Sequence, residues 1–384
     1  MILPWSDAGT VRPVDMPGPV RVLHVVKGLG PGGAERLLVS MATVADPAAV
    51  QHEVAYLLGW KQHLVPELDG IEVRSHLIAG PRGMADPRWP GRLRSLARGF
   101  DVVHLHSPAV AALARLALRT LRHGPVVVST EHNGWGSHGR LTRVANALTL
   151  PLDRVRWAVS QDVVASEWGP WRAKTEVLVH GVLLATLLGR KGERSAARAE
   201  QGWSTDDVVV AIVANLRAHK DYPTLFAAAA LACREEPHLR FASIGQGPLE
   251  DELRRTLAEY SLGDRFVMLG YHADPAAVLV GADVFTLSSR HEGLPISLIE
   301  AMALGLPPVV TRVGGNAEVI THEENGLLAP PGDVPALAQA YVRLARSPAD
   351  RIRLGTAAGV RARDFDIART ARIVEARYRS LVSG

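Results

Sequence analysis

The sequence contains one cysteine, Cys233, among 384 residues. A single thiol forms neither an intramolecular disulfide nor a site held by several thiolates, so both are excluded and a reducing compartment is favoured. No run of about 18 consecutive apolar residues occurs, which argues against a membrane-spanning helix. Residues 1–19 contain prolines and acids but lack the apolar core of an export signal, and we expect a flexible leader there. We therefore predict a cytoplasmic protein.

The positive charge of the chain is unevenly placed. The net charge is +4, and the segment Arg82–Arg98 carries five arginines around Trp89. Such a segment suits peripheral contact with the cytoplasmic face of a membrane or with an acidic acceptor, while a solvated arginine-rich helix face is the simpler alternative. No nucleic-acid partner is expected, since no reader motif accompanies the charge.

Short β-branched runs alternate with helix-like segments along almost the whole sequence. This alternation predicts an α/β protein with parallel sheets covered on both faces. Two blocks of this kind indicate two Rossmann-like domains, at residues 20–183 and 184–364. The last segment, residues 365–384, is predicted to be a helix that packs back on the N-terminal domain.

A glycine loop follows the first predicted strand. Gly28, Gly30 and Gly33 satisfy the G-x-G-x-x-G pattern of dinucleotide sites. An NAD site would also need an acid at the end of the second strand, but "HEVAYLLGW" ends without one and its Glu53 lies near the beginning. The loop therefore favours a phosphate other than that of NAD, and a tight turn without a ligand remains the alternative.

The stretch "SSRHEGLPISLIEAMALGLPPV" places two acids around the start of a helix. Glu292 follows a predicted strand, where α/β sheets bind ligands, and Glu300 falls about one turn into the helix. Backbone N–H groups between them can bind a diphosphate, while the carboxylates accept hydrogen bonds from sugar hydroxyls. This pattern predicts a nucleotide-sugar site.

Several further segments occur in a fixed order with these two. They are "DVVHLHSP", "VLVHGV", "VANLRAHKDYPTL" and "IGQGPLEDEL". With this ordered set, the sequence resembles the retaining nucleotide-sugar glycosyltransferases of family four, the glycosyl transferases group 1, over nearly its whole length. The resemblance implies the GT-B architecture, with two Rossmann-like domains whose parallel sheets face a central cleft.

The resemblance also implies roles for individual residues. His106 matches the family's active-site histidine, Glu292 the residue that contacts the donor sugar, and Lys220 the lysine that neutralises the diphosphate. Glu300 matches the ribose-binding glutamate. Five further residues would present backbone to the donor: Gly32, Gly33, Leu294, Pro295 and Ile296. We expect His104 to point to the opposite face of its strand from His106.

Two positions depart from the family pattern. Asn215 stands where the family usually has an arginine of the phosphate clamp, so that Arg217 would have to supply the charge. A missing charged hydrogen bond costs roughly 1.5–3 kcal/mol if nothing replaces it. The second departure is Val179-His180-Gly181, where the junction commonly carries Asn-Gly.

We therefore predict a retaining hexosyltransferase that uses a nucleoside-diphosphate sugar, UDP being favoured over GDP. No cofactor is expected, and no metal, since no Asp-x-Asp lies at a predicted strand end. The acceptor is a hydroxyl of a lipid-linked sugar, a glycan or a small natural product. Its candidate contacts are Glu131, His132, Asn133 and Trp135, with an ordinary polar loop as the alternative. A GT-B epimerase or hydrolase, or a catalytically weak nucleotide-sugar-binding protein, remain alternative functions.

Overall fold

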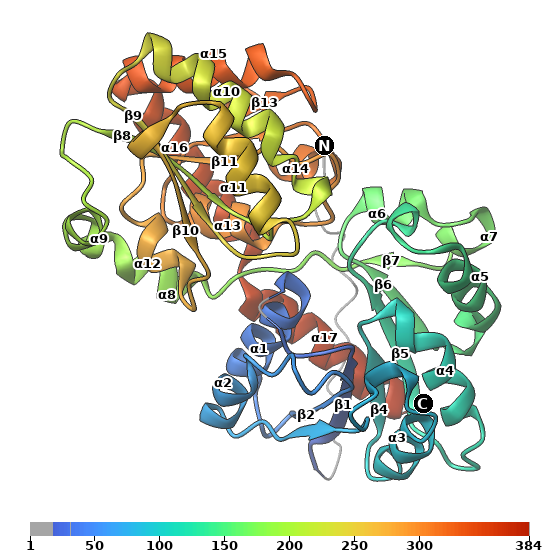
Figure 1. Ribbon diagram of the computed structural model, residues 1–384. Helices are drawn as coiled ribbons and strands as arrows, with labels where there is room; N and C mark the ends of the chain where they lie inside the picture. Colours follow the sequence, from blue (N-terminus) through green and yellow to red (C-terminus); the bar gives the residue numbers. More distant parts are fainter. Residues whose placement is uncertain (1–17, 31, 384) are drawn as a thin grey trace. The chain divides into compact units, whose positions relative to one another are not determined.

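The computed structural model describes residues 18–30 and 32–383, and the chain divides into two compact units (Figure 1). The N-terminal unit comprises the chain up to Gly181 together with the segment from Ile367 onward, and the C-terminal unit is Val182–Asp366. Residues 1–17 of the predicted leader lie outside the described residues. The two unit boundaries each fall two residues from the predicted domain boundaries.

The described part of the N-terminal unit contains a seven-stranded parallel sheet with the order β3-β2-β1-β4-β5-β6-β7. Its strands are β1 (Val20–Val26), β2 (Val50–Tyr56), β3 (Ser75–Leu77), β4 (Val102–Leu105), β5 (Val126–Glu131), β6 (Val155–Ala158) and β7 (Glu176–Val177). Its α-helices are α1 (Gly33–Val44), α2 (Val65–Gly70), α3 (Trp89–Ala97), α4 (Pro108–Arg119), α5 (Arg140–Thr149), α6 (Gln161–Ser166), α7 (Gly169–Arg172) and α17 (Ile367–Val382).

The C-terminal unit contains a six-stranded parallel sheet with the order β10-β9-β8-β11-β12-β13. Its strands are β8 (Val208–Val213), β9 (Leu239–Ile244), β10 (Phe266–Gly270), β11 (Val284–Leu287), β12 (Pro308–Thr311) and β13 (Leu327–Ala329). Its α-helices are α8 (Leu184–Gly189), α9 (Arg194–Glu200), α10 (Tyr222–Glu235), α11 (Glu250–Glu259), α12 (Pro275–Leu279), α13 (Ile296–Ala303), α14 (Gly314–Val319), α15 (Val334–Arg346) and α16 (Pro348–Ala362).

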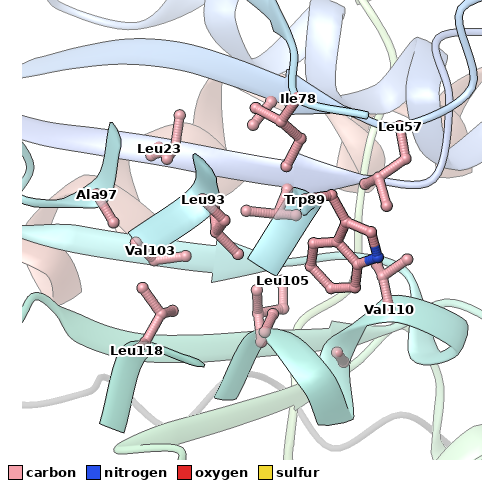
Figure 2. Packing of buried hydrophobic residues seen from close by; sticks show 14 of the residues in the cluster. Leu23, Leu57, Ile78, Trp89, Leu93, Ala97, Val103, Leu105, Val110 and Leu118 are labelled. Carbon is pink, nitrogen blue, oxygen red and sulfur yellow. The ribbon is translucent and has the colours of Figure 1, made fainter. Parts of the chain in front are cut away.

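Both sheets are the parallel α/β sheets predicted from the sequence, and their continuous apolar strands pack on both faces. In β1, Leu23 and Val25 belong to a core with residues of α3 and α4, including Trp89 (Figure 2). Val26 instead packs in a second cluster that contains Leu38 of α1. Because successive strand residues point to opposite faces, one strand contributes to both layers.

The strand order of each unit reverses direction once. In the N-terminal unit the reversal lies between β1 and β4, and in the C-terminal unit between β8 and β11. In open parallel sheets, ligands bind beyond the carboxyl ends of the strands at such a switch point. The glycine loop and His106 follow β1 and β4, and the segments with Lys220 and Glu292 follow β8 and β11. The sheet order therefore marks the same residues as the motifs.

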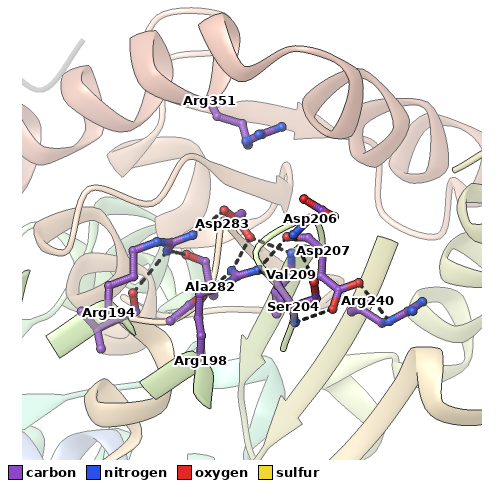
Figure 3. Close-up of polar contacts among 12 residues, drawn as sticks. Arg194, Arg198, Ser204, Asp206, Asp207, Val209, Arg240, Ala282, Asp283 and Arg351 are labelled. Carbon is purple, nitrogen blue, oxygen red and sulfur yellow. Dashed lines mark hydrogen bonds and ion pairs between the residues drawn. The ribbon is translucent and has the colours of Figure 1, made fainter. Parts of the chain in front are cut away.

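A network of charged residues lies at the other ends of β8 and β11 (Figure 3). Asp283 accepts from Arg194 at 2.6 Å, from Arg198 at 3.0 Å and from the N–H of Val209 at 2.9 Å. The buried Arg198 also donates to the carbonyl oxygens of Ser204, Asp207 and Gly281. Buried charges are tolerated when they are paired and fully hydrogen-bonded, so this network ties α9 to the amino ends of the central strands.

In residues 18–30 and 32–383, no helix combines the length and the hydropathy needed to cross a bilayer.

Two glycines of α16 differ in how closely other atoms approach them, and substituting each one tests how tightly this helix packs. A Cβ added at Gly355 would lie 2.2 Å from the carbonyl oxygen of Gly305, whereas at Gly359 the nearest atom is 3.5 Å away. We expect Gly355→Ala to lower the free energy of unfolding by about 1–3 kcal/mol, because backbone would have to move. Gly359→Ala is the matched control and should be neutral or stabilising by up to about 1 kcal/mol, since alanine favours helix. Chemical unfolding of the two variants measures the difference, and equal stabilities would contradict it.

Candidate active site

In the C-terminal unit, the segments after β8 and β11 bring together two of the predicted residues. Lys220 ends the 3₁₀ turn Ala218–Lys220, and Glu292 lies between β11 and α13. The Lys220 Nζ is 2.6 Å from Glu292 Oε1, and both side chains are largely withdrawn from solvent. The sequence separates these residues by 72 positions, so only the sheet order makes them neighbours.

Backbone and side-chain bonds hold the Lys220 segment against the Glu292 segment. Ser288 Oγ donates to the carbonyl oxygen of Lys220 at 2.8 Å, and the Arg290 N–H donates to that of His219 at 2.8 Å. The Arg290 guanidinium pairs with Asp221 at 2.9 Å. Asp221 has a φ of +49°, an uncommon left-handed conformation for a residue other than glycine. This strained position lies directly beside Lys220, as is usual at functional sites.

Glu292 is held from a second side. Ser289 Oγ donates to Glu292 Oε1 at 2.5 Å, and the carbonyl oxygen of Ser289 accepts from the Thr311 hydroxyl at 2.6 Å. The next residue, Gly293, accepts from the Gly315 N–H at 2.8 Å, and a Cβ at Gly315 would lie only 1.9 Å from that oxygen. The loop therefore packs so closely on the start of α14 that only glycine fits.

Helix α13 begins beside this ion pair. Pro295 is its N-terminal cap residue and makes no side-chain hydrogen bond to the first turn. The N–H groups of a first turn lack helical partners and favour anions. Leu294, Pro295 and Ile296 form the approach to the helix, and Glu300 is its fifth residue.

The residues of the modified phosphate clamp lie on the loop after β8. Arg217 is exposed, and its N–H donates to the carbonyl oxygen of Asn215 at 2.9 Å. The loop packs tightly on the "IGQGP" segment, since a Cβ at Gly245 would lie 2.1 Å from the oxygen of Ala214. Arg290 is a second cation near Lys220 that the sequence analysis overlooked, because arginine two residues before a glutamate is an unremarkable pattern without the fold.

In the N-terminal unit, the glycine loop packs against the loop after β2. The Leu29 N–H donates to the carbonyl oxygen of Lys61 at 2.7 Å, and a Cβ at Gly28 would lie 2.9 Å from Lys61 Cβ. Gly32 is the cap residue of α1, which begins at Gly33. A Cβ at Gly32 would lie 2.2 Å from a carboxylate oxygen of Glu35, so this carboxylate already faces the positive helix end.

Glu53, the acid of β2, is paired with a histidine of the neighbouring strand β3. Glu53 Oε2 lies 2.5 Å from His76 Nε2, within the strands. The glycine loop therefore lacks the acid at the end of the second strand that an NAD ribose would need.

His106 is buried directly after β4 and contacts two further histidines. Its Nε2 is 2.8 Å from His24 Nδ1, and its Nδ1 is 3.3 Å from His132 Nε2. The prediction that His104 points to the opposite face was wrong. Residues two positions apart share a face of a strand, and the rings of His104 and His106 lie 3.9 Å apart.

Six histidines form a row, of which five are buried and His132 is half-buried; His24 and His104 lie on the face of β1 and β4 that α17 contacts. His24 Nε2 lies 2.8 Å from His52 Nδ1, and the rings of His132 and His180 stack at 5.5 Å. His104 contacts the Tyr378 hydroxyl of α17 at 2.5 Å and the Thr130 hydroxyl at 2.7 Å. His24, His52 and Tyr378 were not among the predicted residues, and His180 was named only as part of a departure from the family pattern at the junction. The alternation of β1 could have placed His24 on one face, but not beside His106.

Three members of the row also resemble a metal site. His24, His104 and His106 each offer a nitrogen within 4.8 Å of the others. Both nitrogens of His104 already bond to hydroxyls, and the 2.8 Å contact between His24 and His106 is an ordinary N–H···N bond. Hydrogen bonding accounts for these nitrogens without an ion.

Burial keeps the row neutral. It lowers the pKa of His52 and of His132 to about 4. It also holds the pKa of the other buried imidazoles well below the usual value, and neighbouring imidazoles add to the effect; these are His24, His104, His106 and His180. Neutral imidazole has one donor and one acceptor nitrogen, so each ring can link two partners.

The predicted acceptor contacts have different surroundings. Glu131 pairs with His138 at 3.0 Å, Asn133 is exposed, and His132 belongs to the histidine row. Trp135 is buried with Ala147 and Leu150, so its ring is part of the hydrophobic core and is not exposed to an acceptor. A loop tryptophan cannot be assigned to core or surface from sequence alone.

Two family models match the chain along these same segments. Residues 31–166 match the model described as Glycosyltransferase Family 4, and residues 193–360 match Glycosyl transferases group 1. The chain belongs to the group 1 glycosyltransferases. The family predicted from the sequence motifs is thus confirmed.

Curated relatives and solved structures agree with this assignment. The glycosyltransferase is 26% identical to the D-inositol 3-phosphate glycosyltransferase of Pseudarthrobacter chlorophenolicus, over 96% of this chain and 93% of the relative. It is 27% identical to the UDP-Gal:alpha-D-GlcNAc-diphosphoundecaprenol alpha-1,3-galactosyltransferase of Escherichia coli, over 64% and 66% of the two chains. The crystal structure of Anabaena HepE in complex with UDP and glucose superposes with a TM-score of 0.81 at 20% identity, covering 92% and 98%. The GT-B fold class is confirmed.

The buried histidine row predicts acid sensitivity of the N-terminal unit. Unfolded histidines titrate near pH 6.5, above the lowered pKa values of the folded state, so the unfolded chain takes up protons first. Stability is then complete above about pH 6.5 and falls as the pH drops toward 4, by up to about 1.4 kcal/mol per pH unit for each histidine. Chemical unfolding monitored by tryptophan fluorescence at pH 7.5 and 5.5 measures the loss.

One variant isolates the contribution of a single ring. In the part of the chain that the structure describes, neither nitrogen of His180 has a hydrogen-bond partner, and the ring stacks on His132. We expect His180→Phe to keep the stacking and to reduce the loss of stability between pH 7.5 and 5.5 by about 1.4 kcal/mol in total. His123→Phe, at an exposed position, is the control and should leave the slope unchanged. An unchanged slope in His180→Phe would contradict the assignment.

Proposed function

We propose that this glycosyltransferase moves a sugar from a UDP-sugar to an acceptor hydroxyl with retention at the anomeric carbon. The observation that carries the proposal is the 2.6 Å pair of Lys220 and Glu292 at the switch point of the C-terminal unit, beside the uncapped start of α13. A cation, a carboxylate and unpaired backbone N–H groups are what a diphosphate bonded to a sugar requires.

Each group has a separate role in donor binding. Lys220 and the N–H groups at the start of α13 bind the diphosphate, and Glu292 accepts hydrogen bonds from the sugar hydroxyls. Glu300 accepts from the ribose hydroxyls. UDP is favoured as the nucleotide because HepE, with the same fold, is known in complex with UDP and with UDP-glucose.

The reaction breaks the bond between the anomeric carbon and the diphosphate oxygen. The acceptor oxygen bonds to that carbon from the same face, and the acceptor proton passes to the leaving phosphate oxygen. Lys220 and the α13 N–H groups stabilise the negative charge that develops on the leaving group. His106 is the residue of the N-terminal unit that we assign to the reaction, as a hydrogen-bond partner of the donor sugar. No metal is part of this proposal.

The acceptor class is proposed more broadly. The E. coli relative is named for a lipid-linked acceptor and the Pseudarthrobacter relative for an inositol phosphate, so a lipid-linked or a small hydroxyl acceptor is consistent with the family. The Asn215 departure favours one other function, a nucleotide-sugar-binding protein with weak catalysis.

Substitution of the two central side chains tests the assignment. We expect Glu292→Gln and His106→Ala to lower kcat for sugar transfer, or for donor hydrolysis, by about 10²–10³-fold, since each removes a contact to the reacting sugar. Both variants should still show a thermal shift with UDP and none with NAD. Glu324→Gln, at an exposed site, is the matched control. Unchanged rates in the first two variants would overturn the site, and binding of UDP without any turnover by the native chain would favour the binding protein.

A further inference from the structure

Exposed apolar side chains form a stripe along α5. Leu141 is 83% exposed, Leu148 is 76% exposed, and Val144 between them is also exposed. The spacing i, i+3, i+7 places the three residues on one face of the helix. Most soluble surfaces carry single exposed leucines, so a stripe of three on a ten-residue helix points to a contact surface.

The neighbouring helix α4 also has exposed leucines. Its Leu113 and Leu116 are both exposed, while Arg115 between them is buried. The Arg115 guanidinium donates to Asn146 of α5 at 2.7 Å, and Asn146 donates to the carbonyl oxygen of Pro108 at 2.9 Å. These buried bonds join the two helices side by side (Figure 1), so the leucines do not pack between them.

The charge around the leucines has one sign. Neither α4 nor α5 contains an acid, and Arg119, Arg122 and Arg140 are exposed. The only acid in residues 108–152 is Glu131, which pairs with His138. An apolar surface flanked by arginines and free of acids matches an anionic surface that has an apolar interior.

We propose that α4 and α5 form a docking surface for an anionic lipid bilayer. The leucines enter the boundary between head groups and acyl chains, and the arginines pair with lipid phosphates. The predicted segment Arg82–Arg98 is less suited, because Trp89 is buried and Arg92 pairs with Asp86. The proposal extends the proposed function to lipid-linked acceptors, but lipid binding itself is measured without sugar transfer.

Sedimentation with vesicles tests the surface. The full chain should sediment with vesicles of equal parts phosphatidylglycerol and phosphatidylcholine, remain in solution with pure phosphatidylcholine, and bind less as salt rises. Leu141→Gln combined with Leu148→Gln should weaken binding by about tenfold or more. The control is Ile352→Gln combined with Val360→Gln on α16, whose residues are 70% and 60% exposed. This control should bind as the native chain does.

The outcomes separate this proposal from the proposed function. Donor hydrolysis should be equal in the native chain and in the α5 variant, because α5 is outside the assigned site. Equal vesicle binding by both, or an equal loss in the α16 control, would overturn the lipid surface. A native chain that self-associates through these leucines without binding vesicles would also overturn it, in favour of a second copy as the partner.

The histidine row carries an independent inference about His106. Three N···N contacts join His52, His24, His106 and His132 in sequence, each between an Nδ1 and an Nε2. A neutral imidazole carries one hydrogen, so each contact needs its donor from the same side of the row. The tautomers are therefore coupled, and all four rings carry hydrogen on Nδ1 or all carry it on Nε2.

The end of the row distinguishes the two arrangements. His52 Nε2 is buried and has no hydrogen-bond partner among residues 18–30 and 32–383. Hydrogen on Nε2 would leave a buried donor unpaired there, and unpaired buried N–H groups are rare. With hydrogen on Nδ1, the His24 Nδ1–H donates to His106 Nε2, and the His106 Nδ1–H is directed to His132 across the longest contact, 3.3 Å.

We infer that His24, supported by His52, is a positioning residue that holds His106 with its hydrogen on Nδ1. His106 then donates to a hydroxyl of the donor sugar from Nδ1, the nitrogen with the loosest protein contact. This inference rests on the proposed role of His106 in the reaction, but the tautomer can be observed without turnover.

Two variants of His24 and one spectrum test the inference. His24→Phe keeps the ring shape but loses the donor, and should lower kcat by about tenfold or more with KM for the donor nearly unchanged. His24→Asn keeps a donor near the Nδ1 position and should restore most of the rate. Long-range ¹⁵N–¹H spectra of the native chain, with His106 assigned through His106→Gln, should show Nδ1 protonated and Nε2 bare.

Failure of the tautomer inference and failure of the proposed function give different results. A protonated Nε2 on His106 would overturn the inference even if both variants failed to fold. Equal rates in His24→Phe and His24→Asn would indicate a packing role only. A native chain without donor turnover would overturn the proposed function and leave the spectrum as the test of the tautomer.

Discussion

In each unit, two neighbouring parallel strands are followed by segments that leave the sheet on opposite sides, and this divergence is the constraint on which the site depends. In the C-terminal unit it opens the space beyond β8 and β11 where Lys220 and Glu292 meet. In the N-terminal unit it places His106 and the glycine loop beyond β4 and β1. Because β8 and β11 are paired neighbours in the sheet, side chains 72 residues apart in the sequence form a pair just beyond their carboxyl ends.

The two units use burial in different ways. The C-terminal unit holds a cation and a carboxylate together where little solvent screens them, and losing one partner of such a buried pair typically costs about 3–5 kcal/mol. The N-terminal unit instead keeps its row of imidazoles neutral, because desolvation disfavours the charged form. The first arrangement suits a charged diphosphate, and the second suits directed hydrogen bonds to uncharged hydroxyls.

Much of the fold could be predicted from the sequence because its signals are local. β-branched runs alternating with helical segments determine parallel sheets covered on both faces, and the structure has two such sheets. The ordered motifs placed Glu292, Lys220 and His106 after strands, where they lie. Whether a single aromatic residue lies in the core or on the surface was harder to predict. Trp89 and Trp135 have polar sequence neighbours but are buried, because other segments of the chain cover them.

The sequence by itself thus determined the family, the class of donor and the residues around the start of α13, since these depend on residues close together in the chain. The shared face of His104 and His106 follows from the two-residue period of a single strand, so it was open to prediction. Tertiary structure alone decided which distant side chains meet. The pair Lys220–Glu292 and the contact of His24 with His106 follow from strand order and register. The physical reason is that hydrogen bonding between strands sets which residues are neighbours, and local sequence patterns carry no record of that pairing.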